Sequence, residues 1–243
     1  MLRSLEELEE GFRNISEKSK EECRDELEAI RELTLDFNSH FFTAYFENYS
    51  ADGKQRLPKY YNSLVDACFL ELWRISGHIL FLSCNGLYRN AFDNIRYILE
   101  SIVQALYIDL RHPKTDLETK IEILKEVEDK REYHAVRLID ELKIDHKSKL
   151  KEEYKKLSRI IHPSHKQIIA TVSDIIEGKG VPATIDCEEV ERIYDSMKRM
   201  YDIFFFLYTT YFPEIKKSLR KNPEVINDIK VFNLTLLSKA LKA

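Results

Sequence analysis

Glycine and proline are unusually scarce in this chain, each occurring only 6 times in 243 residues. Sheet-rich folds need a tight turn about every 8–12 residues, and these two residue types supply many of those turns. The scarcity therefore favours long, uninterrupted helices and comes close to excluding an all-β fold. Hydrophobic residues make up 44% of the chain, which is enough for a sizeable core and too many for a disordered protein. We expect an all-α protein.

The spacing of apolar residues predicts a bundle of about seven to nine helices in one compact domain. Residues 1–50 are expected to form a long helix or a helix pair, residues 58–211 the core, and residues 212–243 a C-terminal helical extension. Turn and cap residues then set the helix limits. The expected core and extension helices run from Pro58 to Cys84, Leu87 to Leu110, Thr115 to Leu142, Lys147 to Glu177, Asp186 to Tyr211, and onward from Asn222-Pro223.

Charge is distributed unevenly along the chain, although the net charge is only -4. Residues 1–36 carry 12 acidic and 6 basic side chains, whereas residues 143–166 carry 8 basic and 3 acidic ones. The molecule as a whole is therefore not a basic nucleic-acid coat. The basic segment suits an anionic partner or an acidic segment of another molecule, and a solvated helix face is the alternative.

Cysteine usage and the absence of targeting signals predict a cytoplasmic protein. The four cysteines are widely spaced and form no C-x-x-C motif, so reduced, buried thiols are expected. The N-terminal residues are acidic where a signal peptide has its apolar core, and the longest apolar run, residues 203–212, is about half of a membrane span. Glutamine is rare while Lys and Glu are abundant, a bias typical of thermophile proteins.

The motifs of several helical enzyme classes are missing from the sequence. No histidine has a glutamate three residues before it, as ferritin-like di-iron sites require. There is also no His-Glu-x-x-His, no Gly-rich phosphate loop, no Gly-x-Ser-x-Gly and no His-Asp pair. We therefore expect neither a cofactor nor a metal ion.

One short constellation combines groups suited to acid–base chemistry on phosphates. Residues 157–166 read LSRIIHPSHK, which places Arg159 three residues before His162 and six before His165. Histidine titrates near neutral pH, and arginine is a permanent cation that can brace phosphate oxygens. Pro163 disfavours a straight helix at this point, so Arg159 and His165 are able to face one pocket.

The spacing of Arg159 and His165 resembles the signature of the HEPN superfamily, helical-bundle proteins in which four to six residues separate an Arg from a His. Arg96 and Glu100 on an earlier helix, followed by His162-Pro163-Ser164, resemble HEPN-like families that carry an Arg-x-x-x-Glu helix. The resemblance covers roughly residues 58–211, so the N- and C-terminal helices are appended to it. Many HEPN nucleases have a polar residue after the Arg, where this chain has Ile160.

The resemblance implies a metal-independent endoribonuclease of a defence or toxin-type system. His165 would act as general acid and base, and Arg159 would stabilise the phosphoryl oxygens while the RNA 2′-hydroxyl attacks. It also implies a homodimer in which two motifs face one groove, and an antitoxin-like protein partner. The residues expected to bind RNA are His162, Ser164, Arg96, Glu100, Lys155, Lys156 and Lys166, with Tyr154 as a stacking face for a base.

Structural interpretations of the same constellation remain open. The histidines beside Pro163 can cap backbone carbonyls, and Arg159 can pair with Glu152 or Glu153 in solvent. A metal site formed by the two histidines together with Asp174 or a remote carboxylate is a further alternative.

The aromatic run Tyr201–Phe212 and the Arg96–Glu100 pair also have plain structural interpretations. The pair is expected on the surface, in a polar stripe with Arg89 and Asp93. The aromatic run is expected in the core, with a subunit interface for those side chains that cannot all face one core. The second function class is accordingly a non-catalytic module that dimerises and docks an acidic partner or nucleic acid through its basic helix.

Overall fold

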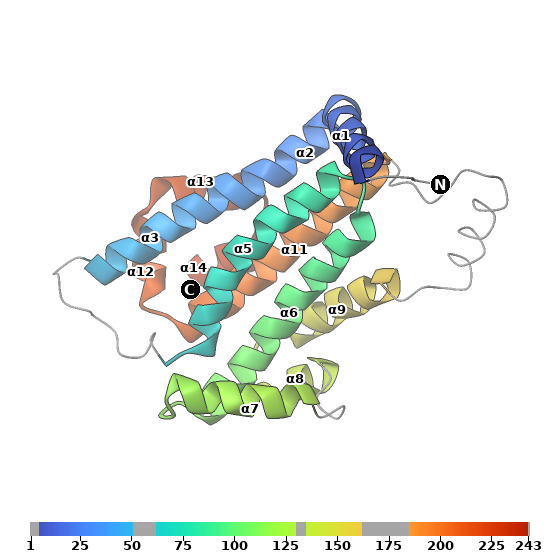
Figure 1. Ribbon diagram of the computed structural model, residues 1–243. Coiled ribbons are helices and arrows are strands. Elements are labelled where there is room, and N and C mark those ends of the chain that lie inside the picture. Colours follow the sequence, from blue (N-terminus) through green and yellow to red (C-terminus); the bar gives the residue numbers. More distant parts are fainter. Residues whose placement is uncertain (1–4, 51–61, 130–134, 162–184, 243) are drawn as a thin grey trace.

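The computed structural model describes residues 5–50, 62–129, 135–161 and 185–242, and every regular element in these ranges is a helix (Figure 1). The all-α prediction is confirmed. The described ranges contain more helices than the seven to nine expected, because both ends of the chain are divided into short ones. The elements are α1 (Leu5–Glu22), α2 (Arg24–Arg31), the π-helical η1 (Glu32–Phe37), α3 (Asn38–Ser50), α5 (Leu64–Cys84), α6 (Tyr88–Arg111), α7 (Leu117–Asp129), α8 (Ala135–Glu141), α9 (Lys147–Ile161), α11 (Cys187–Tyr211), α12 (Ile215–Lys221), α13 (Pro223–Val231) and α14 (Thr235–Lys242).

Two of the predicted helix starts are confirmed by their side-chain caps. Asp186 accepts hydrogen bonds from the backbone N–H groups of Glu188 and Glu189, at 3.0 and 3.2 Å, and opens α11. Asn222 does the same before α13, where Pro223 occupies the first turn and needs no backbone donor.

Two other starts differ from the prediction. Helix α7 is capped by Asp116, whose carboxylate accepts from the N–H of Thr119 at 2.9 Å, and not by Thr115. Helix α5 begins after Ser63, whose hydroxyl caps Asp66, while Pro58 lies outside the described residues. At α7 two cap-forming residues are adjacent in the sequence, and the sequence pattern alone does not choose between them.

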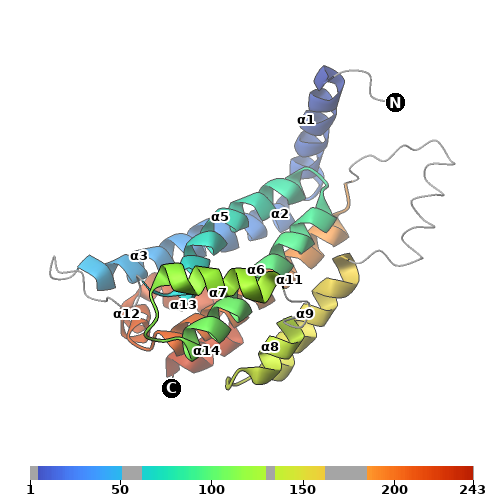
Figure 2. The same cartoon turned by 60° about the horizontal axis from the view of Figure 1, so that its bottom comes forward.

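The helices form one bundle around α5, α6 and α11. These three pack against one another, with α2, η1 and α3 running as a nearly continuous rod along α5 (Figure 1). Helices α12, α13 and α14 pack on α3 and α11, and α7, α8 and α9 pack on α6. Helix α1 projects from one end of the bundle, as Figure 2 shows. The expected N-terminal helices therefore divide into one that joins the core and one that does not.

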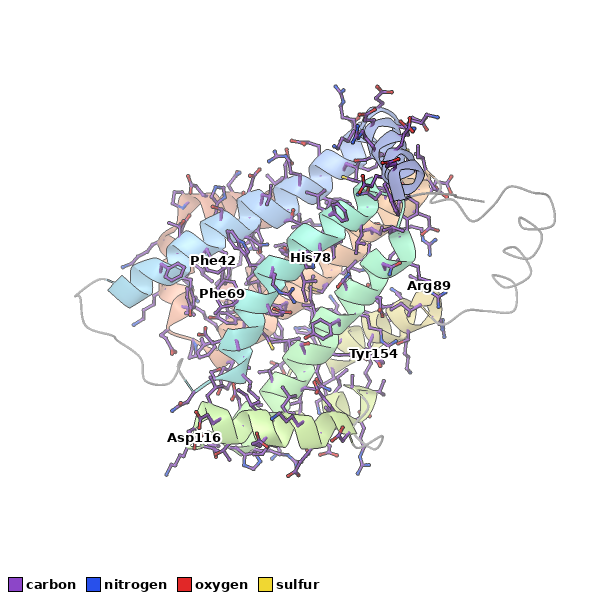
Figure 3. All side chains as sticks on the ribbon, in the orientation of Figure 1. Phe42, Phe69, His78, Arg89, Asp116 and Tyr154 are labelled. Atoms are coloured by element: carbon purple, nitrogen blue, oxygen red, sulfur yellow. A yellow bond between two sulfur atoms is a disulfide. The ribbon has the colours of Figure 1, made fainter. Side chains whose placement is uncertain are left out.

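Aromatic side chains fill the centre of the bundle. Phe37 and Phe41 from the long rod contact Phe205 of α11, with ring centroids 5.0 and 4.2 Å apart. Phe42 and Phe69 stack at 4.7 Å between α3 and α5 (Figure 3). The core interpretation of the aromatic run is confirmed, because helices cover α11 on several sides. Phe205 and Tyr208 are both fully buried, so these two do not form the subunit interface that was the alternative.

A buried ion pair joins α6 to α7 and to the start of α5. Lys120 Nζ lies 2.7 Å from Asp109 Oδ1, and both side chains are almost completely buried. The other oxygen of Asp109 accepts from the Ser63 hydroxyl and from the Val65 N–H. These donors satisfy the carboxylate that burial would otherwise penalise.

A disulfide joins Cys23, between α1 and α2, to Cys187 at the start of α11. The expectation of four reduced cysteines is therefore wrong for this pair. Spacing along the chain gave no sign of it, since the two residues are 164 positions apart and meet only because α2 packs on α11. Cys68 and Cys84 are free thiols, and burial raises the pKa of Cys68 to about 12.

Within the described ranges, α5 is the one helix long and apolar enough to cross a membrane by length and composition. Core helices of soluble proteins meet the same criterion. Its inner face packs on α6, η1 and α11, while Leu70, Trp73 and Phe81 remain exposed.

Candidate functional site

The basic segment of the sequence forms helix α9, which is amphipathic. Leu150, Tyr154 and Leu157 are buried on the side that packs against α6. The intervening positions are mostly lysine, so the opposite side of the helix is a row of cations. Figures 1 and 2 show α9 at the edge of the bundle. Some of its lysines are already paired with nearby acids.

A shallow groove separates the end of α9 from α11 and is lined mainly by cationic side chains. We call it the cationic groove. It has a volume of about 320 Å³, and its cations are Lys156 and Arg159 from α9 with Arg192 and Arg199 from α11, against Asp195 as the one acid. The α11 members lie on one helix face because they are seven residues apart. The remaining lining residues are Ile160 and Ser196.

Three of the four cations have partners among the described residues, and Arg159 has none there. Arg199 Nε donates to Glu153 Oε2 at 2.9 Å, and Lys156 Nζ lies 2.8 Å from Glu152 Oε1. Arg192 pairs with Glu189. Arg159 is exposed and makes no ion pair or hydrogen bond with a described residue.

The proposed surface pairing of Arg159 with Glu152 or Glu153 is therefore wrong. Both carboxylates are engaged by other cations, Glu152 by Lys156 and Glu153 by Arg199. The hydrogen bond and charge of Lys156 hold the pKa of Glu152 below its ordinary value. Among the described residues, the guanidinium of Arg159 is left without an ionic partner, which suits an anionic ligand.

The other predicted site residues are only partly described. Lys156 lines the cationic groove, whereas Lys155 faces a separate open hollow with Tyr154, Ser158 and Arg159. The remaining members of the motif, together with Asp174, lie outside the described residues: His162, Ser164, His165 and Lys166.

Arg96 and Glu100 fasten α9 to α6 and are not the plain surface pair that was expected. Arg96 Nη2 donates to Glu100 Oε1 at 2.9 Å, and the side chains are 19% and 30% exposed. The Tyr154 hydroxyl donates to the same Glu100 oxygen at 2.8 Å and accepts from Arg96 at 3.2 Å. Burial and the hydrogen bond to Glu100 raise the pKa of Tyr154 above its ordinary value.

The predicted stacking role of Tyr154 is also contradicted. Its ring is buried and lies against the Arg96 guanidinium, with the guanidinium carbon 5.4 Å from the ring centroid. A base has no exposed ring face of Tyr154 on which to stack. The contact instead positions α9, the helix that carries Arg159.

Consecutive residues at the start of α6 hold the chain on both sides of residues 162–184. Arg89 Nη2 donates to the backbone carbonyl of Ile161 at 2.6 Å. The Tyr88 hydroxyl accepts from the backbone N–H of Asp186 at 2.9 Å. The last turn of α9 and the start of α11 are thus both held by α6. Arg159 lies in that last turn of α9, and Arg192 lies in the second turn of α11.

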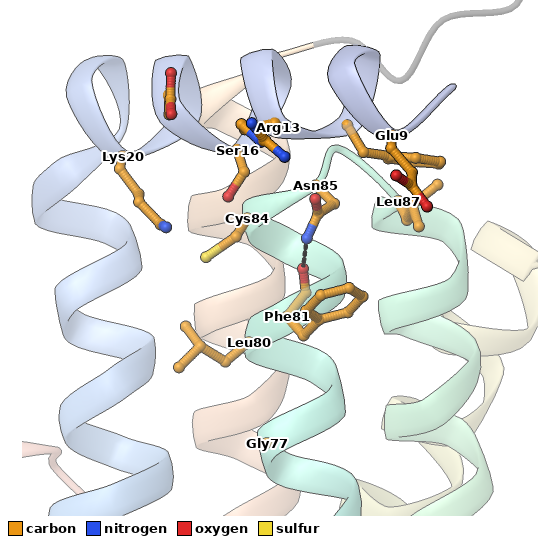
Figure 4. A pocket seen from close by; sticks show the side chains of 12 residues that line it. Glu9, Arg13, Ser16, Lys20, Gly77, Leu80, Phe81, Cys84, Asn85 and Leu87 are labelled. Carbon is orange, nitrogen blue, oxygen red and sulfur yellow. Dashed lines mark hydrogen bonds between the residues drawn. The ribbon is translucent and has the colours of Figure 1, made fainter. Parts of the chain in front are cut away.

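A second hollow, larger and chemically different, lies between α1 and the end of α5. We call it the α1–α5 hollow. Its volume is about 730 Å³, and Leu80, Phe81 and Leu87 supply apolar walls beneath Phe12 of α1. Its charges alternate along α1: Glu9, Arg13, Glu17 and Lys20. Figure 4 shows α1 lying across the ends of the other helices, with Lys20 extending toward Cys84.

Among the described residues, no three His, Cys, Asp or Glu side chains gather into a group that could hold a metal ion. Comparison of the chain with protein-family models, with curated proteins and with solved structures finds no significant match. The site must therefore be interpreted from its own residues. The sequence located Arg159 and Lys156, and it missed Arg192 and Arg199, whose spacing of seven was the available signal.

Proposed function

We propose that the protein binds RNA through the cationic groove and cleaves it without a metal ion. The observation that supports binding is the convergence of four cationic side chains from two helices, with Arg159 unpaired among the described residues. Phosphate groups along an RNA backbone are the usual partners of such a row. The cleavage step rests on the sequence, because His165 lies outside the described residues.

In the proposed reaction, the 2′-hydroxyl oxygen of one nucleotide attacks the adjacent phosphorus. The new P–O2′ bond forms as the P–O5′ bond breaks, which leaves a cyclic phosphate and a free 5′-hydroxyl. His165 accepts the proton of the 2′-hydroxyl or returns one to the leaving 5′-oxygen, and a homodimer would supply one histidine for each step. Arg159 stabilises the charge that builds on the phosphoryl oxygens.

The proposal is tested by RNA cleavage in the presence of a strong chelator. Arg159→Ala and His165→Ala should each lower the cleavage rate by about 100-fold or more, the size of effect typical for loss of a general acid–base or charge-stabilising group. Lys230→Ala removes an exposed charge on α13, away from the groove, and should cleave normally. Intact RNA with the wild-type protein, or normal cleavage by both active-site variants, overturns the enzymatic proposal.

A non-catalytic binding module is the second candidate, because the described lining of the groove has four cations and one carboxylate but no histidine. RNA that binds to the protein and remains intact supports this function. An acidic protein, such as an antitoxin-like partner, would compete with RNA for the same cations. Fluorescence anisotropy with labelled RNA separates the two candidates when it is run beside the cleavage assay.

We also propose a cytoplasmic location in a thermophilic source. The Cys23–Cys187 disulfide is consistent with it, because intracellular proteins of hyperthermophiles are an exception to the rule that such bonds are extracellular. The optimum growth temperature of the source organism and the thiol content of the protein isolated from its cytosol test this proposal.

A further inference from the structure

The buried carboxylate of Glu153 has one oxygen without a hydrogen-bond partner. Glu153 is 3% exposed, and its Oε2 accepts from Arg199 Nε at 2.9 Å. Its Oε1 is buried and finds no donor among the described residues. Buried polar atoms are nearly always paired in native proteins, so an unpaired carboxylate oxygen indicates that a donor is missing.

Glu153 lines a pocket beside the cationic groove, which we call the inner pocket. It lies between α9, α11 and the start of α14 and has a volume of about 330 Å³, within the range of small-molecule sites. Its polar side chains include Lys149, Glu152, Lys198, Asp202, Asn233 and Thr235.

The other two acids of the inner pocket are already engaged. Glu152 pairs with Lys156. Both oxygens of Asp202 cap α14, accepting from the N–H groups of Leu236 and Leu237 at 2.9 Å. Among the described residues that line this pocket, Glu153 is thus the one buried acid, and its Oε1 has no hydrogen-bond partner. Lys149 makes no ion pair or side-chain hydrogen bond with a described residue and supplies a free donor.

The inner pocket is continuous with the cationic groove, because Lys156 and Arg199 line both. A nucleotide whose phosphate lies in the groove is therefore placed to put its base in the inner pocket. Bases of single-stranded RNA are commonly read in this way, by hydrogen bonds to an unpaired edge.

We propose that the inner pocket binds a guanine base of the RNA and that Glu153 is the residue that selects it. Guanine is the one common RNA base with two adjacent N–H donors, N1–H and N2–H, on its pairing edge, and both suit a carboxylate oxygen. Its O6 is an acceptor beside them, where Lys149 can donate. This inference rests on the proposed function, since the bound RNA brings the base to the pocket.

The first measurement needs only the wild-type protein. Calorimetric titration with GMP, AMP, CMP and UMP should show GMP binding about tenfold or more tightly than each of the others, the discrimination expected of a good paired contact. Equal affinities for the four nucleotides, or no detectable binding of any of them, overturn the guanine pocket.

The second measurement uses Glu153→Gln, which keeps the side chain's size but puts an N–H₂ group in place of one carboxylate oxygen. It should abolish the preference for GMP, whereas Glu128→Gln on the exposed face of α7, away from the inner pocket and the cationic groove, should retain it. A variant Glu153→Gln that still prefers GMP also overturns the assignment. Thermal unfolding of each variant separates lost recognition from lost structure.

Single-stranded RNA distinguishes the failure of this inference from failure of the proposed function. Oligomers of the same length with and without guanine should differ about tenfold in affinity. Equal, tight binding of both contradicts the guanine pocket and leaves the RNA-binding groove standing. A preference for GMP in the absence of any RNA binding supports the pocket and contradicts the proposed function.

Discussion

The α1–α5 hollow and the cationic groove differ in size, in chemistry and in what holds their walls in place. The α1–α5 hollow, at about 730 Å³, is more than twice the volume of the cationic groove, at about 320 Å³. Its walls are apolar and its charges alternate in sign, whereas the groove gathers four cations around one acid. Volume alone would favour the first as the functional site. The predominance of positive charge in the cationic groove, which two separate helices contribute, favours the groove as the functional site.

The α1 region and the α9 region also differ in the interactions that attach them to the rest of the bundle. The C-terminal end of α1 is attached to α11 through the Cys23–Cys187 disulfide. Helix α9 is held by noncovalent contacts: its apolar face, the Arg96–Glu100–Tyr154 hydrogen bonds, and the bond from Arg89 to Ile161. The first region should therefore respond mainly to redox conditions, and the second to salt, pH and substitution of single polar groups.

Removal of the disulfide should have the largest effect on stability. It closes a loop with a sequence separation of 164 residues, and loss of such a link costs about 5 kcal/mol in the chain-entropy account. The variant with both Cys23→Ser and Cys187→Ser should unfold at a clearly lower urea concentration. RNA affinity should stay near wild type, because the cationic groove has no part in this link.

The control for that prediction is the reductant. Reduction should destabilise the wild-type protein by a similar amount and leave the double variant unchanged. Alkylation followed by mass spectrometry should find two reactive thiols in the unfolded, unreduced protein, Cys68 and Cys84. Four reactive thiols, or identical urea midpoints with and without reductant, would contradict the proposed difference between the two regions.

Removal of cations should affect RNA binding in one region only. The double variant Lys156→Ala, Arg159→Ala takes two charges from the cationic groove and should weaken RNA binding by about 10–100-fold at low salt, or about 1.4–2.7 kcal/mol. The slope of log affinity against log salt should become shallower by about 1.4, because each phosphate contact on a single strand contributes about 0.7.

The matched control is Arg13→Ala, Lys20→Ala, which removes two cations from the α1–α5 hollow. It lowers the net charge of the protein by the same amount and should change RNA affinity less than about twofold. If the two double variants weaken binding equally, RNA affinity depends only on the net charge of the protein. The distinction between the hollows would then fail.

The sequence predicted the features that depend on neighbouring residues. Asp186 and Asn222 predict the starts of their helices correctly, because a cap residue and the backbone N–H groups that it accepts from lie within three residues of each other. Features that join distant segments were missed: the disulfide, the buried Lys120–Asp109 pair and the contribution of α11 to the groove. Tyr154 shows the same limit, since its place on a basic helix indicated an exposed ring, and packing against α6 buried it.

The smallest predicted effect concerns the noncovalent fastening of α9. Tyr154→Phe removes the hydroxyl that donates to Glu100 and accepts from Arg96, while the Arg96–Glu100 bond remains. The free energy of unfolding should fall by about 1 kcal/mol at pH 7, the usual net value of such a bond. Tyr97→Phe on the exposed face of α6 is the control, with a change below about 0.5 kcal/mol.

The pH dependence of the stability difference between wild type and Tyr154→Phe is a second, independent test. Because the folded state raises the pKa of Tyr154 above 10.0, the unfolded hydroxyl ionises first as the pH rises. The stabilisation is fully present below pH 10 and is lost as the pH increases through the folded-state pKa, so the stability gap between wild type and Tyr154→Phe should narrow there. A gap that stays constant across this range, or one as large as the loss of the disulfide, would show that the hydroxyl fastens α9 in some way other than through Glu100.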